Sequence, residues 1–561
     1  MVAMRALATL VLLSACATTQ PPPQAPPAAP PPAAKAPQEA PKAASIPPAP
    51  AACAPYLEAP MGCEANRSLA DRLADALGES ESLTRDHKLA CVEQEGGPAA
   101  GMLRALRADL APVACADALV TPYLEASQPP TPEIENSLLG LMLSARLSRL
   151  GQNPPVLEPP YDKTKFLDFF EHTLKPWTVS EALAIGDLSL QGAKLTGYGK
   201  AVAAIEAGLA DLRFVKMARS IPLPTELASD PEVRDVYYAS LDQALEPRKA
   251  RGRDAALVGL RLFAELGVIK DPRLSRARQL LAELYGGSHV AALDGLLLPE
   301  LPALRTDSVD QKLAARLPTY YALEFLSGLK EVADPKILRA FAERGLPTTV
   351  RTRLDGEKLS NEARLVYAEL EAQRGMTYFS APAFAHAAQI ASGAPNDPGA
   401  ELIAALGHAL EGAPKDAAVL MLNGPRLTGP LGSLDALNAL AQKKHRYAGE
   451  AEFDAASISA LTPPDGDARF WRELAGRYDH AEKALRDKAA RARAHELADA
   501  ARKTADAVAQ TAPPAPASGA RSAPAAAPAA APAPAAAPAP AAAPAPAAAP
   551  APAAAPAPAA H

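Results

Sequence analysis

Apolar residues recur at intervals of three and four positions through most of the chain between residues 53 and 510. In the segment 273–285, Leu274, Ala277, Leu281 and Leu284 fall on one face of a helix. Val and Ile are sparse, and no long run alternates apolar with polar residues as a strand would. The pattern therefore predicts an all-α fold, a multi-helix array of helical hairpins.

Helix boundaries are marked by short motifs. Each Asp-Pro dipeptide precedes an amphipathic stretch, and aspartate suits the N-cap while proline suits the first helical position. Gly267 and Gly286-Gly287 are expected to end the segments 254–266 and 273–285, which would form a helix–turn–helix pair. The Asp-Pro dipeptides begin at Asp230, Asp271, Asp334 and Asp397. Further helices are expected at about 64–77, 136–150, 179–192, 198–218, 231–245, 310–328, 335–344, 361–374, 382–392, 398–411 and 433–443.

The last three Asp-Pro dipeptides are separated by 63 residues each, a regularity that a solenoid of helical repeats would explain. Coincidence is the other interpretation, because the residues between them do not align and the first interval is 41. Both interpretations stay open at this point.

The first sixteen residues form a distinct unit. One positive charge, at Arg5, precedes an apolar run at 6–13, which is too short to span a bilayer but suits a signal peptide. The run ends in Leu13-Ser14-Ala15-Cys16, which resembles the lipobox of bacterial lipoproteins, whose cysteine receives diacylglycerol before cleavage. The resemblance implies a lipid anchor on Cys16. In lipoproteins of Gram-negative bacteria, an aspartate directly after the cysteine favours retention in the inner membrane. Ala17 occupies that position here, so the resemblance also implies location in the outer membrane of a Gram-negative bacterium. An ordinary cleavage site followed by a chance cysteine is the alternative.

The four remaining cysteines are Cys53, Cys63, Cys91 and Cys115. An even number in an exported chain indicates two disulfides, and the favoured pairs are Cys53–Cys63 and Cys91–Cys115. The first pair would close a short loop and the second would clip a helical hairpin. Spacings of 10, 28 and 24 residues lack the close cysteine pair of most zinc sites, so no metal site is predicted.

Proline-rich segments flank the helical region. Proline makes up 13 of the 36 residues in 17–52, and 511–561 repeats the sequence AAAPAP. Repeated proline prevents helix formation, so both segments are expected to be extended and disordered. The predicted organisation is a signal peptide (1–15), a lipidated N-terminus and tether (16–52), a disulfide-clipped helical subdomain (53–130), a main helical domain (131–468), one long charged helix (469–510) and a disordered Ala-Pro tail (511–561).

Charge and motifs exclude several functions. The formal net charge is -6, with no basic stripe for nucleic acid. His495-Glu496-Leu497-Ala498-Asp499 only begins like a zinc-protease motif, and the Ser-x-x-Lys sequence from Ser327 to Lys330 lacks its Lys-Thr-Gly companion. Asp465-Gly466-Asp467 is interpreted as a turn, while His386 and His408 lie in apolar helices and could face one another. No catalytic residue, metal or cofactor is predicted.

Two functional hypotheses follow. The first is a membrane-anchored, periplasm-facing binding or scaffold lipoprotein that engages an envelope protein or peptidoglycan. The second is a peptidoglycan-modifying hydrolase whose site is assembled from distant residues. Two glycine-containing breaks between helices, 286–299 and 424–432, are either recognition loops or simple connections.

Overall fold

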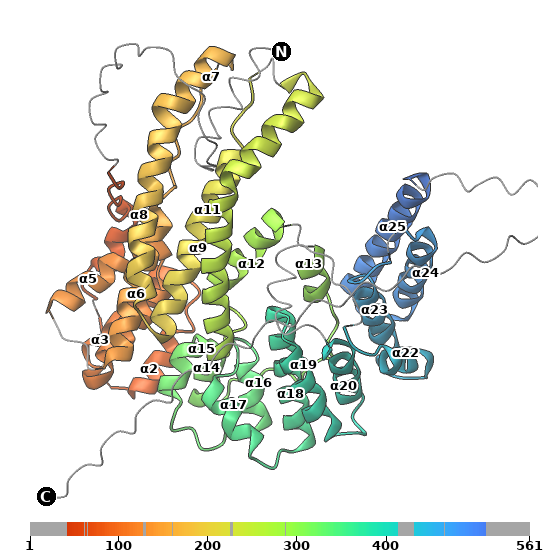
Figure 1. The fold of residues 1–561 in the computed structure, drawn as a ribbon. Coiled ribbons are helices and arrows are strands. Elements are labelled where there is room, and N and C mark those ends of the chain that lie inside the picture. The colour runs from red at the N-terminus through yellow and green to blue at the C-terminus, as the bar shows by residue number, and fades with distance from the viewer. Residues whose placement is uncertain are drawn as a thin grey trace, which may run out of the picture. The chain divides into compact units, whose positions relative to one another are not determined.

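The computed structural model describes residues 42–60, 62–63, 66–126, 131–159, 161–224, 228–285, 288–412, 431–464 and 466–511. Throughout these ranges the regular structure is helical and no strand is present, which confirms the predicted all-α array (Figure 1). The signal peptide, Cys16, most of the tether and nearly all of the Ala-Pro tail lie outside the described residues. None of the described helices is long and apolar enough to cross a membrane.

The N-terminal part is held by two disulfides, but the favoured pairing is wrong. Cys53 bonds to Cys115 and Cys63 to Cys91, each pair with Cα atoms 5.3 Å apart. Cys53 is buried in a 3₁₀ helix that packs against the turn holding Cys115, so it cannot close a local loop with Cys63. The elements are η1 (Ala51–Leu57), α2 (Leu69–Ala76), α3 (Ser82–Gln94), η2 (Gly97–Ala99), α4 (Ala100–Leu110), η3 (Val113–Cys115) and α5 (Ala116–Ala126).

The next part is built around α9, which contacts α6, α8, α11 and α12. Buried residues occur on all sides of α9, as expected of a helix enclosed by neighbours. α7, the π-helix η4 and α8 follow one another without a break. The separate helices predicted at 231–245 and 254–266 form one helix, α11. The elements are α6 (Pro132–Arg149), α7 (Lys163–Phe169), η4 (Phe170–Leu174), α8 (Lys175–Ala193), α9 (Gly197–Arg219), α11 (Pro231–Leu266) and α12 (Pro272–Tyr285).

A buried polar network joins the N-terminal part to α9 and α12. The Arg273 guanidinium donates to Asp109 at 2.5 Å and to Asp271 at 3.0 Å. The Tyr198 hydroxyl donates to Asp109 at 2.6 Å, and its ring stacks on Tyr320 with centroids 4.3 Å apart. Removing one partner would leave a buried charge uncompensated, so this network fixes how these helices meet.

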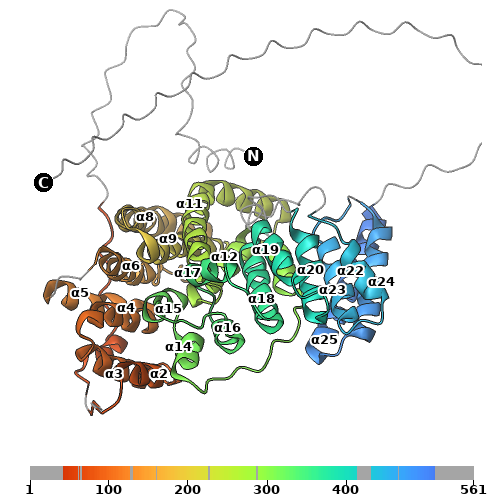
Figure 2. The same ribbon diagram turned by 90° about the horizontal axis from the view of Figure 1, so that it is seen from below.

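Among the following helices, α18, α19 and α20 lie side by side in Figure 2 and contact one another. The single helix predicted at 310–328 is divided, because Pro318 follows an extended Leu317 and begins a second helix. Asp230, Asp334 and Asp397 accept backbone hydrogen bonds as N-caps, which confirms these predicted starts. The elements are α13 (Ser288–Asp294), α14 (Val309–Arg316), α15 (Thr319–Phe325), α16 (Pro335–Phe341), α17 (Thr348–Asp355), α18 (Asn361–Tyr378), α19 (Ala381–Ser392) and α20 (Pro398–Leu410).

The three helices that begin at equally spaced Asp-Pro dipeptides have different neighbours. The first, α12, packs mainly on α9, whereas α16 contacts α14 and α18. The third, α20, contacts α18, α19, α22 and α23. The shared feature is the N-cap, and the packing around it differs at each position.

The C-terminal helices correct a further prediction. Residues 469–510 were expected to form one long helix, but Leu485 is extended and two helices result. Ion pairs join Asp479 to Arg502 and Glu482 to His495, so the two helices run antiparallel. The apolar stripe of one helix thereby packs against the alanines of the other. The elements are α22 (Asp435–Gln442), α23 (Ala448–Ser459), α24 (Ala468–Ala484) and α25 (Lys488–Thr511).

Candidate functional site

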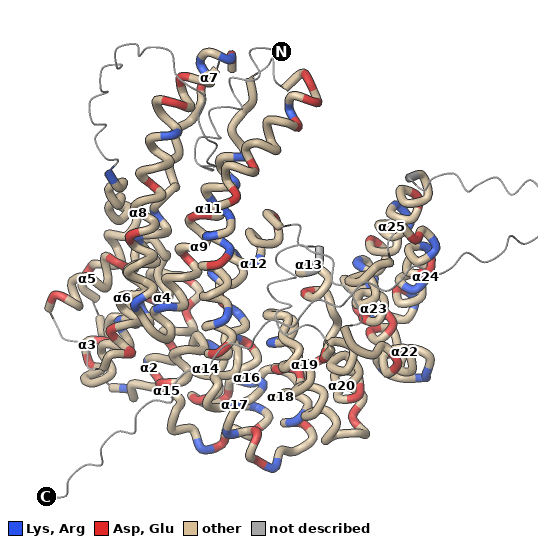
Figure 3. Tube along the Cα trace, viewed as in Figure 1, with Lys and Arg blue, Asp and Glu red and all other residues tan. Residues whose placement is uncertain are grey.

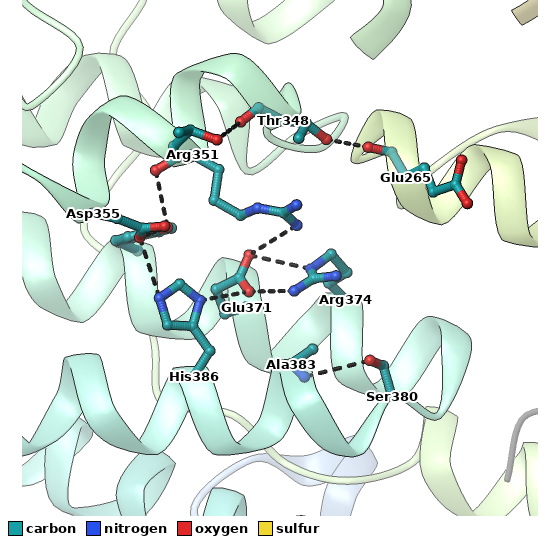
Figure 4. Close-up of polar contacts among 11 residues, drawn as sticks. Glu265, Thr348, Arg351, Asp355, Glu371, Arg374, Ser380, Ala383 and His386 are labelled. Carbon is teal, nitrogen blue, oxygen red and sulfur yellow. Dashed lines mark hydrogen bonds and ion pairs between the residues drawn. The ribbon is translucent and has the colours of Figure 1, made fainter. Parts of the chain in front are cut away.

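A cluster of chemically versatile side chains lies where α17, α18 and α19 meet (Figure 4). His386 of α19 stands between two carboxylates, with Nδ1 3.0 Å from Glu371 of α18 and Nε2 3.2 Å from Asp355 at the end of α17. Arg374 donates to the same Glu371 at 2.6 Å, and the Tyr367 hydroxyl donates to Asp355 at 2.6 Å.

The electrostatics of this cluster favour a charged imidazole. The hydrogen bond to Glu371 raises the pKa of His386 above its ordinary value, and this outweighs the opposite effect of burial. Burial would raise the pKa of Glu371, but hydrogen bonds from His386 and Arg374 leave it below the ordinary value. A protonated imidazole has no lone pair with which to accept a proton. In this state the cluster fastens three helices together and cannot act as a general base.

The structure separates the histidines that the sequence suggested as a pair. His386 contacts Glu371 and Asp355, whereas the half-exposed His408 contacts Glu411 at 3.2 Å. His386 and its two partners come from positions about fifteen residues apart in sequence, on three helices, and no local motif links them.

The other motif candidates lie on the surface. The Ser327 hydroxyl donates to the carbonyl of Glu324 at 3.2 Å, and both Ser327 and Lys330 are exposed. His495 is exposed and contacts Glu482 and Asp499. Asp467 accepts hydrogen bonds from the first backbone amides of α24, which agrees with the turn interpretation; Asp465 lies outside the described residues.

The two glycine-containing breaks have structural roles where they are described. Leu293 and Leu296 of the first break are buried in the core, and the backbone amide of Leu297 donates to the buried Asp454 at 2.8 Å. In the second break, residues 424–430 lie outside the described residues, and Leu431 is buried. These contacts are those of a connecting segment.

The end of the predicted tether is packed against the helical body. Residues 42–50, here called the strap, were expected to be free. Ala44 N–H donates to the carbonyl of Ser180 at 2.9 Å, and Arg149 donates to the carbonyl of Pro47 at 2.8 Å. The Cys53–Cys115 disulfide follows directly. The strap is therefore part of the folded body.

An open cleft of about 550 Å³ lies beneath the strap. Its lining includes Pro47, Pro112, Arg149, Arg213 and Arg276. Arg149 is paired with Asp117 and Arg213 with Glu206, so two of the three guanidiniums are already neutralised by neighbouring carboxylates. The cleft thus has a rigid proline wall and little net charge.

Charge is spread over the helices, with Lys and Arg interspersed among Asp and Glu (Figure 3). Within the described ranges, no group of three or more His, Cys, Asp or Glu side chains is arranged to hold a metal ion. No protein-family model, curated protein sequence or solved structure matches this chain.

Proposed function

We propose that this protein is a lipid-anchored binding or scaffold protein of the bacterial cell envelope. The observation that supports it best is the strap, which fastens the N-terminal tether to the helical body. Backbone hydrogen bonds at Ala44 and Pro47 are followed by the disulfide at Cys53. A body attached in this way to a lipidated chain would be held at a membrane while its helical surface stays available to partners.

The geometry of the His386 cluster agrees with this role better than with catalysis. Both imidazole nitrogens are held by carboxylates, so the residues best suited to proton transfer are used to join helices. The proposed partner is an envelope protein or peptidoglycan. Release of soluble fragments from purified peptidoglycan by the isolated protein would contradict the scaffold role and favour a hydrolase.

The anchor is tested by changing Cys16 to Ala in the full-length chain. We expect loss of radiolabelled palmitate incorporation and a shift of the protein from the membrane to the soluble fraction, because several acyl chains on one cysteine provide the attachment. Changing Ser14 to Ala is the control, since it keeps a small residue before the cysteine. Unchanged labelling and membrane association in the Cys16→Ala protein would refute the proposal.

A further inference from the structure

The cleft beneath the strap is lined by segments that are far apart in the sequence. The strap contributes Pro47, Pro48 and Pro50, while α9 contributes Arg213 and α12 contributes Arg276. The turn after α4 and the end of α6 complete the lining. The volume of about 550 Å³ lies within the range of about 300–1,000 Å³ that is typical of small-molecule sites.

The walls of this cleft are fastened to one another. The disulfide from Cys53 to Cys115 joins the chain directly after the strap to the turn between α4 and α5. Arg149, with 7% of its side chain exposed, donates to the carbonyl of Pro47 at 2.8 Å and to the carbonyl of Ala114 at 2.7 Å, so it also joins these two walls. Because the walls are held in place before a ligand arrives, binding requires less ordering of the protein.

One guanidinium of the cleft has no carboxylate partner. Arg149 is paired with Asp117, and Arg213 is paired with Glu206. The exposed Arg276, by contrast, forms no hydrogen bond or ion pair within the part of the chain that the structure describes. The cleft therefore presents one uncompensated positive charge, which suits a ligand with a single anionic group.

The rest of the lining is small, apolar and amide-bearing. Val113 and Ala114 extend the apolar surface of the prolines, and Gln152 and Asn153 contribute side-chain amides. Gln152 donates from its amide nitrogen to the carbonyl of Ser148 at 2.6 Å, which leaves its amide oxygen as an acceptor. No aromatic ring is present among the described residues that line the cleft, so a nucleobase would have no ring to stack on. This lining matches a ligand with amide groups, small apolar side chains and one anionic end.

We propose that the cleft binds the end of a short peptide that has small apolar side chains and a free C-terminal carboxylate. Arg276 donates to the carboxylate, since a guanidinium offers it two parallel N–H groups. The prolines of the strap pack against the small side chains, and the amides of Gln152 and Asn153 pair with the peptide groups. This site rests on the proposed binding role and names the chemistry of its partner.

Two sources in a cell envelope supply such an end. A protein C-terminus consists of L-residues, whereas a peptidoglycan stem peptide ends in D-alanine. The probes are therefore N-acetyl-L-alanyl-L-alanine and N-acetyl-D-alanyl-D-alanine, which differ only in configuration. Tighter binding of the D-peptide identifies peptidoglycan as the source, and equal or tighter binding of the L-peptide identifies a protein C-terminus.

The test is a titration of full-length protein, purified in detergent, with each peptide, followed by ligand-observed NMR. We expect Arg276→Gln to raise the dissociation constant of the preferred peptide by about threefold to tenfold, because a charge-assisted hydrogen bond is lost. Amidating the C-terminus of that peptide should have a similar effect on the wild-type protein. The matched control is Arg278→Gln, which changes an arginine of the same helix that is paired with Asp294 and does not line the cleft.

The strap provides a second measurement. A peptide that contacts the strap prolines would hold the strap against the body, so the amide of Ala44, which donates to Ser180, should exchange with solvent more slowly when the peptide is added. Without peptide, the exchange rate of this amide should be the same in the wild-type and Arg276→Gln proteins. This comparison shows that the variant keeps the strap in place.

Three outcomes would overturn the peptide site. These are the absence of binding by either peptide, equal binding to the Arg276→Gln protein, and equal binding of the amidated peptide. The scaffold role is judged separately, because release of soluble fragments from peptidoglycan contradicts it whether or not the peptides bind. Conversely, a failure of the peptides to bind refutes this site and leaves the anchor and the other surfaces of the scaffold unaffected.

Discussion

At the scale of single residues, His386 shows how a side chain known for proton transfer can serve as a fastener. Its two nitrogens lie between Glu371 and Asp355, so the ring, when protonated, pairs with a buried carboxylate and with the last residue of α17. Glu371 is almost completely buried, with 2% of its side chain exposed, and would be costly there without cationic partners. His386 is therefore expected to stabilise the fold when its ring is protonated.

Changing His386 to Gln should destabilise the protein in a pH-dependent way. The pKa of His386 is raised by folding, so its stabilisation is complete below the unfolded value of about 6.5 and is lost as the pH rises through the folded pKa. We expect a loss of about 2 kcal/mol in unfolding free energy at pH 6, and less at pH 9. Urea unfolding measures both. The control is His408→Gln, on an exposed histidine, and an identical loss at the two pH values would argue against a charged His386.

At the scale of helices, the boundaries set by local capping residues were easier to predict than the breaks within an apolar stripe. The Asp-Pro starts and the end of α11 at Gly267, whose φ is 84°, follow from local capping and were predicted. The breaks at Leu317 and Leu485 were missed, because a periodic apolar stripe continues across both. Pro318 marks the first break locally, whereas the second break lets the two halves pack against each other, and an apolar stripe alone shows neither break.

The close crossings of helices give a second prediction. Gly259→Ala would place a Cβ against the side chain of Ile205 and 2.8 Å from the carbonyl of Ala201, both on α9. We expect this overpacking to lower the unfolding free energy by about 1–3 kcal/mol, as measured by urea denaturation. Gly476→Ala meets open space, so the helix containing it should become more stable by up to about 1 kcal/mol. Hydrogen exchange in 468–484 measures this local gain, and similar destabilisation by both variants would contradict the argument.

At the scale of the whole molecule, the sequence favoured disulfides within two local segments, Cys53–Cys63 and Cys91–Cys115. The two disulfides of the structure instead connect these segments to each other. Cys53–Cys115 spans 62 residues, and it fixes the base of the strap to the turn that begins α5. Cys63–Cys91 spans 28 residues and holds the loop before α2 against α3. The first disulfide therefore fastens the chain to the body directly after the strap.

Removing the first disulfide should loosen the strap. For Cys53→Ser with Cys115→Ser, chain entropy predicts a loss of up to about 4 kcal/mol in unfolding free energy. The amide of Ala44, which donates to Ser180, should also exchange with solvent faster. The control pair, Cys63→Ser with Cys91→Ser, should leave that exchange rate unchanged. Peptide mapping that finds Cys53 bonded to Cys63 would contradict the structure.

The sequence by itself determined the helical class, most helix starts and the presence of proline-rich flanks, because these depend on residues within one or two turns of each other. The lipobox at Cys16 was likewise visible only in sequence, and it remains a prediction. Tertiary structure alone decided the disulfide pairing, the partners of His386 and the attachment of the strap. Each of these depends on contacts between residues far apart in the chain, which local periodicity does not encode.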